Sequence, residues 1–442
     1  MFAEYIRLSS FRLPRLLFYL GVLLIAQTRW RPILSFTLSD WLFLAAFLCA
    51  LIVLMGQSKV EIPIPKIVLI GLGLFMVGGL LSTIRAQFPI SSLIALLKYF
   101  YLFGVWVWLG TILLRRSEEI RDTMIFWTIS AAVTSAGAAI QMLWGDVIPG
   151  GNFPITDRMT GFSEHFNDLG EITSVALVPA LYVATHDHQK TWLSFCMWFS
   201  AFLVVAGLIW SSSLTGIVAA ATGLLIWMIT NKAGLKHFGV LVIGGATILF
   251  LILIASNSVN GLNRLAVVTT HEESLGNKHD ILKLGDRLRN LKNEKHRFPS
   301  LLPRYTTYDE AWESISQNFI VGVGLGPANG RTSSGHVVHN LWLGSWYEGG
   351  FFALLGICLL VGGIAKIGLR IFLDSSLEES SRMMGASLFA AHSSLLVLGL
   401  AHPIYYKRFV WIPTLLLIAL YVRNKVEERL EGKAEGLDLL TR

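Results

Sequence analysis

Long, uninterrupted apolar blocks are the feature that most limits how this 442-residue chain can fold. A window of about 20 residues, enough to cross ~30 Å of hydrocarbon, finds roughly twelve of them. Backbone polar groups cannot stay unpaired in lipid, and the blocks are too continuously apolar for barrel strands, so we expect an all-α polytopic membrane protein. The predicted spans centre on 16–28, 40–56, 67–83, 92–114, 122–143, 170–185, 191–210, 214–230, 238–256, 340–365, 384–404 and 409–422.

The composition excludes several other classes of protein. Hydrophobic residues make up 54% of the chain and charged residues only 15%, whereas a soluble domain carries about 25% charged residues. A soluble enzyme is therefore excluded. We also expect no nucleic-acid partner, because asymmetry between the loops accounts better for the net charge of +7.

The distribution of Lys and Arg between the short loops predicts the orientation. With the N-terminus in the cytoplasm, the cytoplasmic tails and loops hold 19 of these residues and the opposite short loops hold six. Cytoplasmic loops are normally the richer in Lys and Arg, so both termini are predicted to be cytoplasmic. The six on the opposite side are Arg29, Arg31, Arg85, Arg158, Lys407 and Arg408.

One connection is much longer than the rest. Residues 257–338 form a loop of about 80 residues on the outer face, and loops of that length are usually functional or disordered. The predicted organisation is one membrane domain in three parts. Spans 1–9 occupy 1–256, the loop occupies 257–338, and spans 10–12 with a cytoplasmic tail occupy 339–442.

The second half of this loop has a helical period. Tyr305, Tyr308, Trp312, Ile315 and Phe319 recur at steps of three and four residues. This spacing predicts an amphipathic helix lying on the membrane surface or on the helical bundle. The glycine-rich stretch that follows has no strand–helix unit around it, so we expect it to end the helix in a tight turn and not to bind a nucleotide.

Eight basic residues lie within 278–304, and Arg287 and Arg304 are among them. Guanidinium groups pair with phosphate oxygens, so an outer-face stretch of this kind suits an anionic headgroup or a diphosphate lipid. A solvated charged loop is the alternative interpretation for most of these residues. The sequence leaves both open.

Two histidines, His336 and His339, precede the tenth predicted span. His339 lies where the loop meets the bilayer, a place from which a side chain can exchange protons near neutral pH. A structural role is the alternative. No carboxylate or cysteine nearby completes a ligand set with the two histidines, so no metal is expected.

Three further residues are candidates from their positions. Asn167 precedes the sixth span and suits capping or hydrogen bonding to sugar. Lys98 and Glu348 lie within predicted spans, where ionisable groups are costly and often functional. The alternatives are snorkelling for Lys98, and packing at a helix bend beside Gly349 and Gly350 for Glu348.

Four stretches in order resemble the O-antigen ligase and polymerase-like family of bacterial membrane glycosyltransferases. The first runs from Arg158 to Asn167, with an Arg-x-x-Gly-Phe…His-x-Asn pattern, and the second is Ser211–Gly216. The remaining stretches are Arg304-x-x-x-Tyr308 with Phe319–Gly324, and His339–Leu343 with Glu348-x-Gly350. The resemblance covers about 150–425; before that it extends only to hydropathy.

The resemblance implies a bacterial inner-membrane enzyme whose active site and large loop face the periplasm. In this family a glycan on undecaprenyl diphosphate is transferred with inversion and without a metal or other cofactor. The acceptor is lipid A–core or a growing glycan. The catalytic arginine and histidine of the family correspond to Arg304 and His339. An arginine would neutralise growing phosphate charge, and a histidine would orient or deprotonate the acceptor hydroxyl.

The chain departs from the family pattern at one position. Leu214 stands where a second arginine is expected. The candidate replacements are Arg158, Lys98, Arg287 and Arg331, and the predicted substrate-binding residues are these together with Asn167, Asn340 and Glu348. The departure also leaves open the alternative that the protein is a polysaccharide polymerase or a protein O-oligosaccharyltransferase of the same family. A transporter of lipid-linked oligosaccharides is the alternative from another class.

Overall fold

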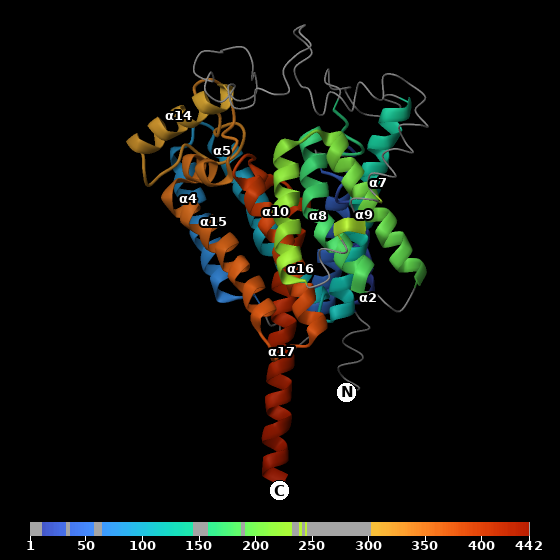
Figure 1. The fold of residues 1–442 in the computed structure, drawn as a ribbon. Helices are drawn as coiled ribbons and strands as arrows, with labels where there is room; N and C mark the ends of the chain where they lie inside the picture. Colours follow the sequence, from blue (N-terminus) through green and yellow to red (C-terminus); the bar gives the residue numbers. More distant parts are fainter. Residues whose placement is uncertain are drawn as a thin grey trace.

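A computed structural model describes residues 11–31, 36–56, 64–144, 158–186, 191–231, 238–240, 244 and 302–441. Within these ranges the chain forms helices and connecting loops without a β-sheet (Figure 1). The helices are α2 (Arg12–Leu23), α3 (Leu38–Met55), α4 (Lys66–Arg85), α5 (Pro89–Phe100), the π-helix η1 (Tyr101–Trp106), α6 (Val107–Leu113), α7 (Ser117–Trp144), α8 (Phe166–His186), α9 (Thr191–Ser211), α10 (Leu214–Thr230), α14 (Leu302–Gln317), α15 (Leu341–Leu373), α16 (Glu379–Gly399), the 3-10 helices η2 (Ile404–Tyr406) and η3 (Arg408–Trp411), and α17 (Ile412–Thr441).

Eight stretches of the described chain are long and apolar enough to cross a membrane. The prediction of an all-α polytopic membrane protein is therefore confirmed for the described residues, while the number twelve stays a prediction. The eight are Leu38–Met55, Lys66–Arg85, Pro89–Leu113, Ser117–Trp144, Phe166–His186, Thr191–Ser211, Leu341–Leu373 and Arg408–Glu428.

The other four predicted spans differ from these eight. Most of 238–256 lies outside the described residues. Helix α10 has 17 residues and is a shorter apolar helix. Helix α16 has 21 residues but includes several serines and His392 among its buried side chains, so its polar groups face other helices and its hydropathy is lower.

The first predicted span is shorter than expected. Helix α2 has only 12 residues and ends at Leu23. The chain then turns against α7, where the amide of Ala26 donates to Ser130 Oγ (3.2 Å) and Gln27 Nε2 donates to Ser130 O (3.1 Å). Because α7 satisfies these polar groups, the backbone does not need to continue as a helix.

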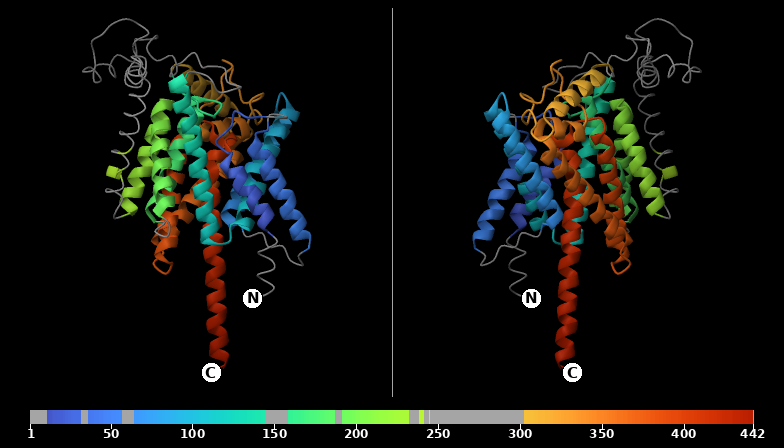
Figure 2. Two further views of the ribbon diagram at one scale, coloured as in Figure 1. Left: turned by 90° about the vertical axis from the view of Figure 1, so that its right-hand side faces the viewer. Right: turned by 90° about the vertical axis from the view of Figure 1, so that its left-hand side faces the viewer.

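Several loops meet at one end of the bundle, which we call the loop end. It comprises the connections after α2, α4, α9 and α16, the segment 158–165, and the region 302–340. Hydrogen bonds tie these segments together, among them Arg29 N to Phe162 O (3.3 Å) and Phe88 N to Asn329 Oδ1 (2.9 Å). Figures 1 and 2 show α14 across this end and α17 projecting from the opposite end.

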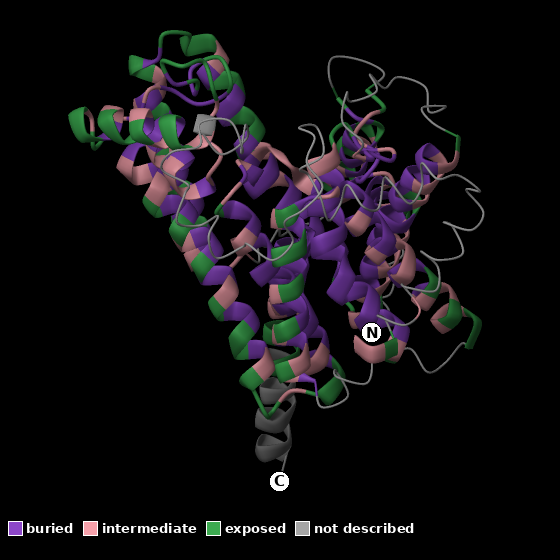
Figure 3. Ribbon diagram, turned by 45° about the horizontal axis from the view of Figure 1, so that its top comes forward, coloured by how far each residue is buried: buried purple, intermediate pink, exposed green. Residues whose placement is uncertain are grey.

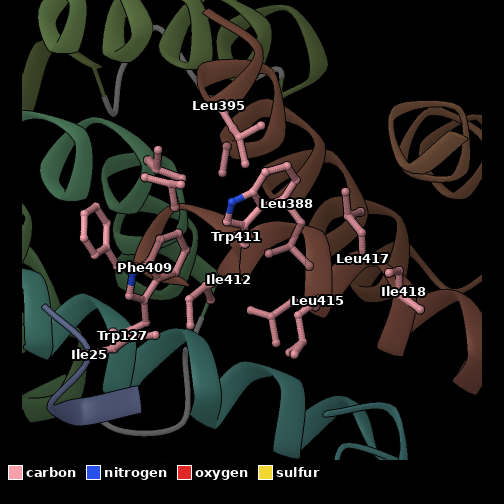
Figure 4. Close-up of a cluster of buried hydrophobic side chains, with 14 of the residues drawn as sticks. Ile25, Trp127, Leu388, Leu395, Phe409, Trp411, Ile412, Leu415, Leu417 and Ile418 are labelled. Carbon is pink, nitrogen blue, oxygen red and sulfur yellow. The ribbon is translucent and has the colours of Figure 1, made fainter. Parts of the chain in front are cut away.

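The centre of the bundle is formed by α8 and the first half of α17. The apolar window of α8 is 89% buried and that of Arg408–Glu428 is 78% buried, against 33% for α3. Buried residues gather along the middle of the molecule in Figure 3. Figure 4 shows Trp411, Ile412 and Leu415 of this segment packed among apolar side chains that include Trp127 of α7. Such a rigid centre can hold the adjoining loop residues in fixed positions.

The amphipathic helix predicted in the large loop is present as α14. Its buried face differs from the predicted one: Tyr308 is half-buried, and Ala311 and Ile315 are buried against Tyr347 of α15. Trp312 is 57% exposed. The helix is therefore rotated relative to the predicted stripe, because it packs along α15 on the smaller side chains.

Helix α15 is broken at Gly350, which has φ +76° and ψ −172°. The glycine-rich segment after α14 fills this break and supplies its hydrogen-bond partners. Val323 N donates to Tyr347 O (3.0 Å), Gly324 N donates to Glu348 O (3.0 Å) and Phe351 N donates to Ile320 O (3.1 Å). The segment after α14 is thus held against α15 by backbone hydrogen bonds on both sides of the break.

The close approach at this break predicts that added side chains will not fit. A Cβ on Gly350 would lie 2.1 Å from Ile320 O, and a Cβ on Gly322 would lie 2.2 Å from Glu348 O. We expect Gly350→Ala and Gly322→Ala to cost more than about 1 kcal/mol of stability and to lower the apparent Tm in detergent. Gly362→Ala is the matched control, because a Cβ there meets nothing within 4 Å. Equal Tm values for all three variants would contradict this description of the break.

Candidate active site

His339 immediately precedes α15 at the loop end and is half-buried. Its backbone oxygen accepts a hydrogen bond from Tyr308 Oη (2.6 Å), which joins it to α14. Its Nδ1 atom is buried and has no hydrogen-bond partner in the described part of the chain. Burial, and then the positive charges of Arg304 and Lys407, lower the pKa of His339. The imidazole is therefore neutral at pH 7 and able to accept a proton.

Arg304 lies in the first turn of α14, four residues before Tyr308 and so on the same face of the helix. No carboxylate pairs with it among the described residues. Its charge acts on both Tyr308 and His339. The structure therefore brings together the two residues that the sequence predicted to be catalytic, although they are 35 residues apart in the chain.

The charge of Arg304 also acts on Arg158. Burial, and then the charge of Arg304, lower the pKa of Arg158 to about 10. Its guanidinium group donates to Ser211 O (2.9 Å), Ser212 O (2.8 Å) and Asn167 Oδ1 (3.2 Å). Arg158 therefore holds the turn between α9 and α10, and Asn167 orients it.

The turn that Arg158 holds contains the position of the expected second arginine. Ser212 has φ +48°, and the side chain of Leu214 is 75% exposed at the start of α10. Leu214 does not pack into the cluster of Arg158 and Arg304. The guanidinium of Arg158 lies next to this turn instead.

A second group of charges was not recognised from the sequence. Lys407 Nζ lies 2.7 Å from Asp168 Oδ1 and 2.7 Å from Glu171 Oε1. Burial alone would lower the pKa of Lys407, but the carboxylates of Asp168 and Glu171 raise it above its usual value. His402 Nδ1 lies 3.5 Å from Glu171 Oε1. These residues form a charged network between α8 and the segment before η3.

The network adjoins the predicted catalytic pair. Burial, and then the charges of Lys407 and Arg304, lower the pKa of His402 to about 2. Burial also lowers the pKa of His165, although Asp168 opposes this effect. His402 and His165 are therefore neutral, and among the described residues the positive charges next to them are those of Arg158, Arg304 and Lys407.

The network predicts a large loss of stability when Lys407 is removed. Lys407→Met leaves the buried carboxylate of Glu171 without its cation, and breaking a buried pair costs about 3–5 kcal/mol. We expect a clearly lower apparent Tm in detergent, partly restored by Glu171→Gln in the same chain. Lys366→Met, an exposed lysine of α15, is the control. An unchanged Tm for Lys407→Met would show that the network does not stabilise the fold.

The remaining predicted site residues have other surroundings. Asn340 caps α15, where its Oδ1 accepts from Trp342 N and Leu343 N (both 2.9 Å). Arg331 is exposed and donates to Gly335 O (2.7 Å). Lys98 lines a separate cavity beside Lys407. Arg287 lies outside the described residues.

Glu348 is 1% exposed and lies at the break in α15. It accepts hydrogen bonds from Tyr405 Oη (2.5 Å), Tyr406 Oη (3.3 Å) and Gly326 N (2.9 Å). This arrangement favours the alternative of packing at a helix bend. In the described ranges, no three His, Cys, Asp or Glu residues are grouped in a way that could hold a metal ion.

Part of the chain is similar to a known protein family. Residues 199–358 match the family model of the O-antigen ligase, a stretch that runs from α9 past the break in α15 and includes both Arg304 and His339. No curated protein matches the chain significantly. The predicted resemblance to an O-antigen ligase-like family is confirmed over this stretch.

Proposed function

We propose that the protein transfers a glycan from undecaprenyl diphosphate to an acceptor hydroxyl, with lipid A–core as the acceptor. The observation that carries this proposal is the meeting of Arg304 and His339 at the loop end, within a stretch that matches the O-antigen ligase family. An arginine without a carboxylate partner among the described residues, near a neutral histidine, offers a diphosphate-binding group and a proton acceptor at one place.

The diphosphate of the donor would lie against Arg304 and Arg158. The guanidinium of Arg304 can donate paired hydrogen bonds to phosphate oxygens. Arg158 can add its charge and the N–H groups of Nη1, since Nε and Nη2 already donate to Ser211, Ser212 and Asn167. An anion between the two side chains would also relieve their mutual repulsion. Arg158 approaches the turn in which Leu214 replaces the expected arginine. We therefore infer that Arg158 supplies the charge missing at Leu214.

In the proposed reaction the acceptor oxygen attacks the anomeric carbon and its proton passes to His339. A bond forms between that oxygen and the anomeric carbon as the bond from the carbon to the phosphate oxygen breaks, so the configuration inverts. The electron pair leaves with undecaprenyl diphosphate, whose growing charge is neutralised by Arg304 and Arg158. Since these cations stabilise the leaving group, we propose that the reaction needs no metal.

We place this chemistry on the periplasmic side of the inner membrane. The excess of 19 over six Lys and Arg in the short loops favours cytoplasmic termini and a periplasmic loop end. A donor and an acceptor that are both carried on lipid could then reach the site from the outer leaflet.

A polymerase or a protein O-oligosaccharyltransferase is the second candidate, and the leucine at position 214 favours it because the family's usual donor contact is altered. Deletion of the gene separates these functions. Loss of a ligase leaves bare core, whereas loss of a polymerase leaves core that carries one repeat unit. Unchanged lipopolysaccharide together with loss of glycan from proteins would favour the oligosaccharyltransferase.

A further inference from the structure

A cavity of about 370 Å³ lies at the loop end between the α2–α3 connection, α5 with η1, and residues 405–409. This volume is within the range of about 300–1,000 Å³ that is usual for small-molecule sites. Lys407 and Asp168 line it, so the charged network beside His339 also forms one of its walls. The cavity and the predicted reaction centre are therefore neighbours.

The charges in this cavity are of both signs. Arg31 pairs with Glu164, Arg408 pairs with Asp40, and Lys407 pairs with Asp168. Lys98 also lines the cavity and has no carboxylate partner among the described residues. With four cations and three carboxylates, the lining carries one net positive charge.

This pairing of charges disfavours a diphosphate and favours a saccharide. A diphosphate would meet the repulsion of three carboxylates. A sugar hydroxyl can accept from an ammonium or guanidinium group and donate to the neighbouring carboxylate at the same time, so each ion pair offers a binding place for a hydroxyl. The unpaired charge of Lys98 would tolerate one negative charge on the saccharide.

Aromatic side chains complete the cavity. Tyr101, Tyr406 and Phe36 line it, and the Tyr101 hydroxyl is buried without a hydrogen-bond partner in the described ranges. Phe36 is 43% exposed. Apolar surface with a few placed polar groups is usual in ligand sites, and the flat apolar faces of sugar rings suit aromatic rings. The free Tyr101 hydroxyl would find a partner in a sugar oxygen.

We propose that this cavity binds the saccharide part of the acceptor. This inference rests on the proposed glycan transfer. The position of His339 distinguishes the acceptor from the donor. On the proposed diphosphate side, Tyr308 on the Arg304 face of α14 donates to the backbone oxygen of His339. On the other side, Asn340, next to His339, donates to Leu400 O (3.0 Å) in the connection that continues to Lys407 of the cavity wall. An acceptor sugar held at Lys407 would present its hydroxyl toward His339, while the donor enters from the side of Arg304 and Arg158.

Binding without transfer tests this proposal. The probes are two lipid-free oligosaccharides from the producing cell, the lipopolysaccharide core and the repeat unit, and inorganic diphosphate. Saturation-transfer NMR with the full-length protein in detergent gives their affinities. We expect one oligosaccharide to bind, and the double variant Lys98→Gln, Glu164→Gln to weaken it at least about tenfold, since hydrogen bonds to charged groups are lost. The variant should leave diphosphate binding unchanged.

The control is Lys366→Gln, an exposed lysine at the other end of the bundle, which should bind like the unmodified protein. Lys98, Glu164 and the Arg31 partner of Glu164 are all exposed. The double variant should therefore fold normally, and an unchanged Tm checks this. The proposal is overturned if neither oligosaccharide binds, if the double variant binds with unchanged affinity, or if its diphosphate binding is weakened instead.

A separate transfer assay distinguishes failure of this proposal from failure of the proposed function. Transfer activity without oligosaccharide binding in the cavity would overturn only the acceptor site. Binding that depends on Lys98 and Glu164 in a protein without transfer activity would overturn the glycosyltransferase and leave a saccharide-binding site.

Discussion

His339→Ala is expected to reduce glycan transfer by about 10²–10⁴-fold, the usual contribution of a general base, without lowering the amount of protein in the membrane. The fold should survive because the Tyr308 hydroxyl bonds to the backbone oxygen of His339 and not to its ring. Initial rates with purified protein give the effect on kcat, and lipopolysaccharide ladders show it in cells.

His336→Ala is the matched control, since His336 is an exposed histidine three residues away. It should retain normal ladders. The pH dependence of the rate is a second readout. The pKa of His339 is lowered from the usual histidine value of about 6.5, so the ring is neutral at neutral pH. Activity should therefore hold at neutral pH and fall only as the pH drops through that lowered pKa. Full activity of His339→Ala would remove this residue from the reaction.

Arg304→Gln is expected to lower kcat by about 10²–10³-fold, as removal of a group that stabilises charge in the transition state does. Arg304→Lys should recover only part of the loss, because an ammonium group keeps the charge but not the paired donors of a guanidinium. Rates at saturating donor separate this effect from weaker binding, which raises KM.

The control for Arg304 is Arg85→Gln, an exposed arginine at the same end of the bundle that bonds to Asn318. It should transfer glycan at the normal rate. If Arg304→Gln and Arg85→Gln behave alike, Arg304 has no special role. If Arg304→Lys is as active as the unmodified protein, a point charge is sufficient and the paired-donor explanation is wrong.

The apolar blocks predicted most of the helical architecture because lipid imposes a length and a composition on any helix that crosses it. That constraint holds for helices such as α4 and α9, whose bounds differ little from the predicted ones. It fails at α2, because Ser130 of α7 accepts hydrogen bonds from the amide of Ala26 and the side chain of Gln27. Contacts of this kind between distant segments are not visible in hydropathy.

The predicted catalytic pair was found through motifs, but the charged network was missed for a physical reason. Lys407 lies in a short loop that was predicted to be on the outer face, where a lysine is counted as a topology signal. Asp168 and Glu171 are three residues apart at the start of α8, a spacing that places both on one face of a helix and could have indicated a buried cation partner. No sequence rule identified Lys407 as that partner, 236 residues from Glu171.

The break in α15 shows a similar limit. The sequence predicted that glycines end the helix before 319–326, and α14 does end at Gln317. That the same glycines fit against the backbone at Gly350 depends on two segments meeting in space. Glu348 illustrates the consequence, because its bonds to Tyr405 and Tyr406 hold together elements that no local pattern connects.

Reconstitution of the reaction with purified protein tests the proposed glycan transfer. Glycan on undecaprenyl diphosphate is mixed with lipid A–core in detergent, where no membrane gradient exists, and the product is followed by mass spectrometry. We expect the unmodified protein to form lipid A–core that carries the glycan and to release undecaprenyl diphosphate. With His339→Ala, neither product should form. The proposal would be contradicted if folded protein formed no product with lipid A–core, repeat-unit or protein acceptors. If the same protein moved the donor across vesicle membranes, a transporter would be favoured.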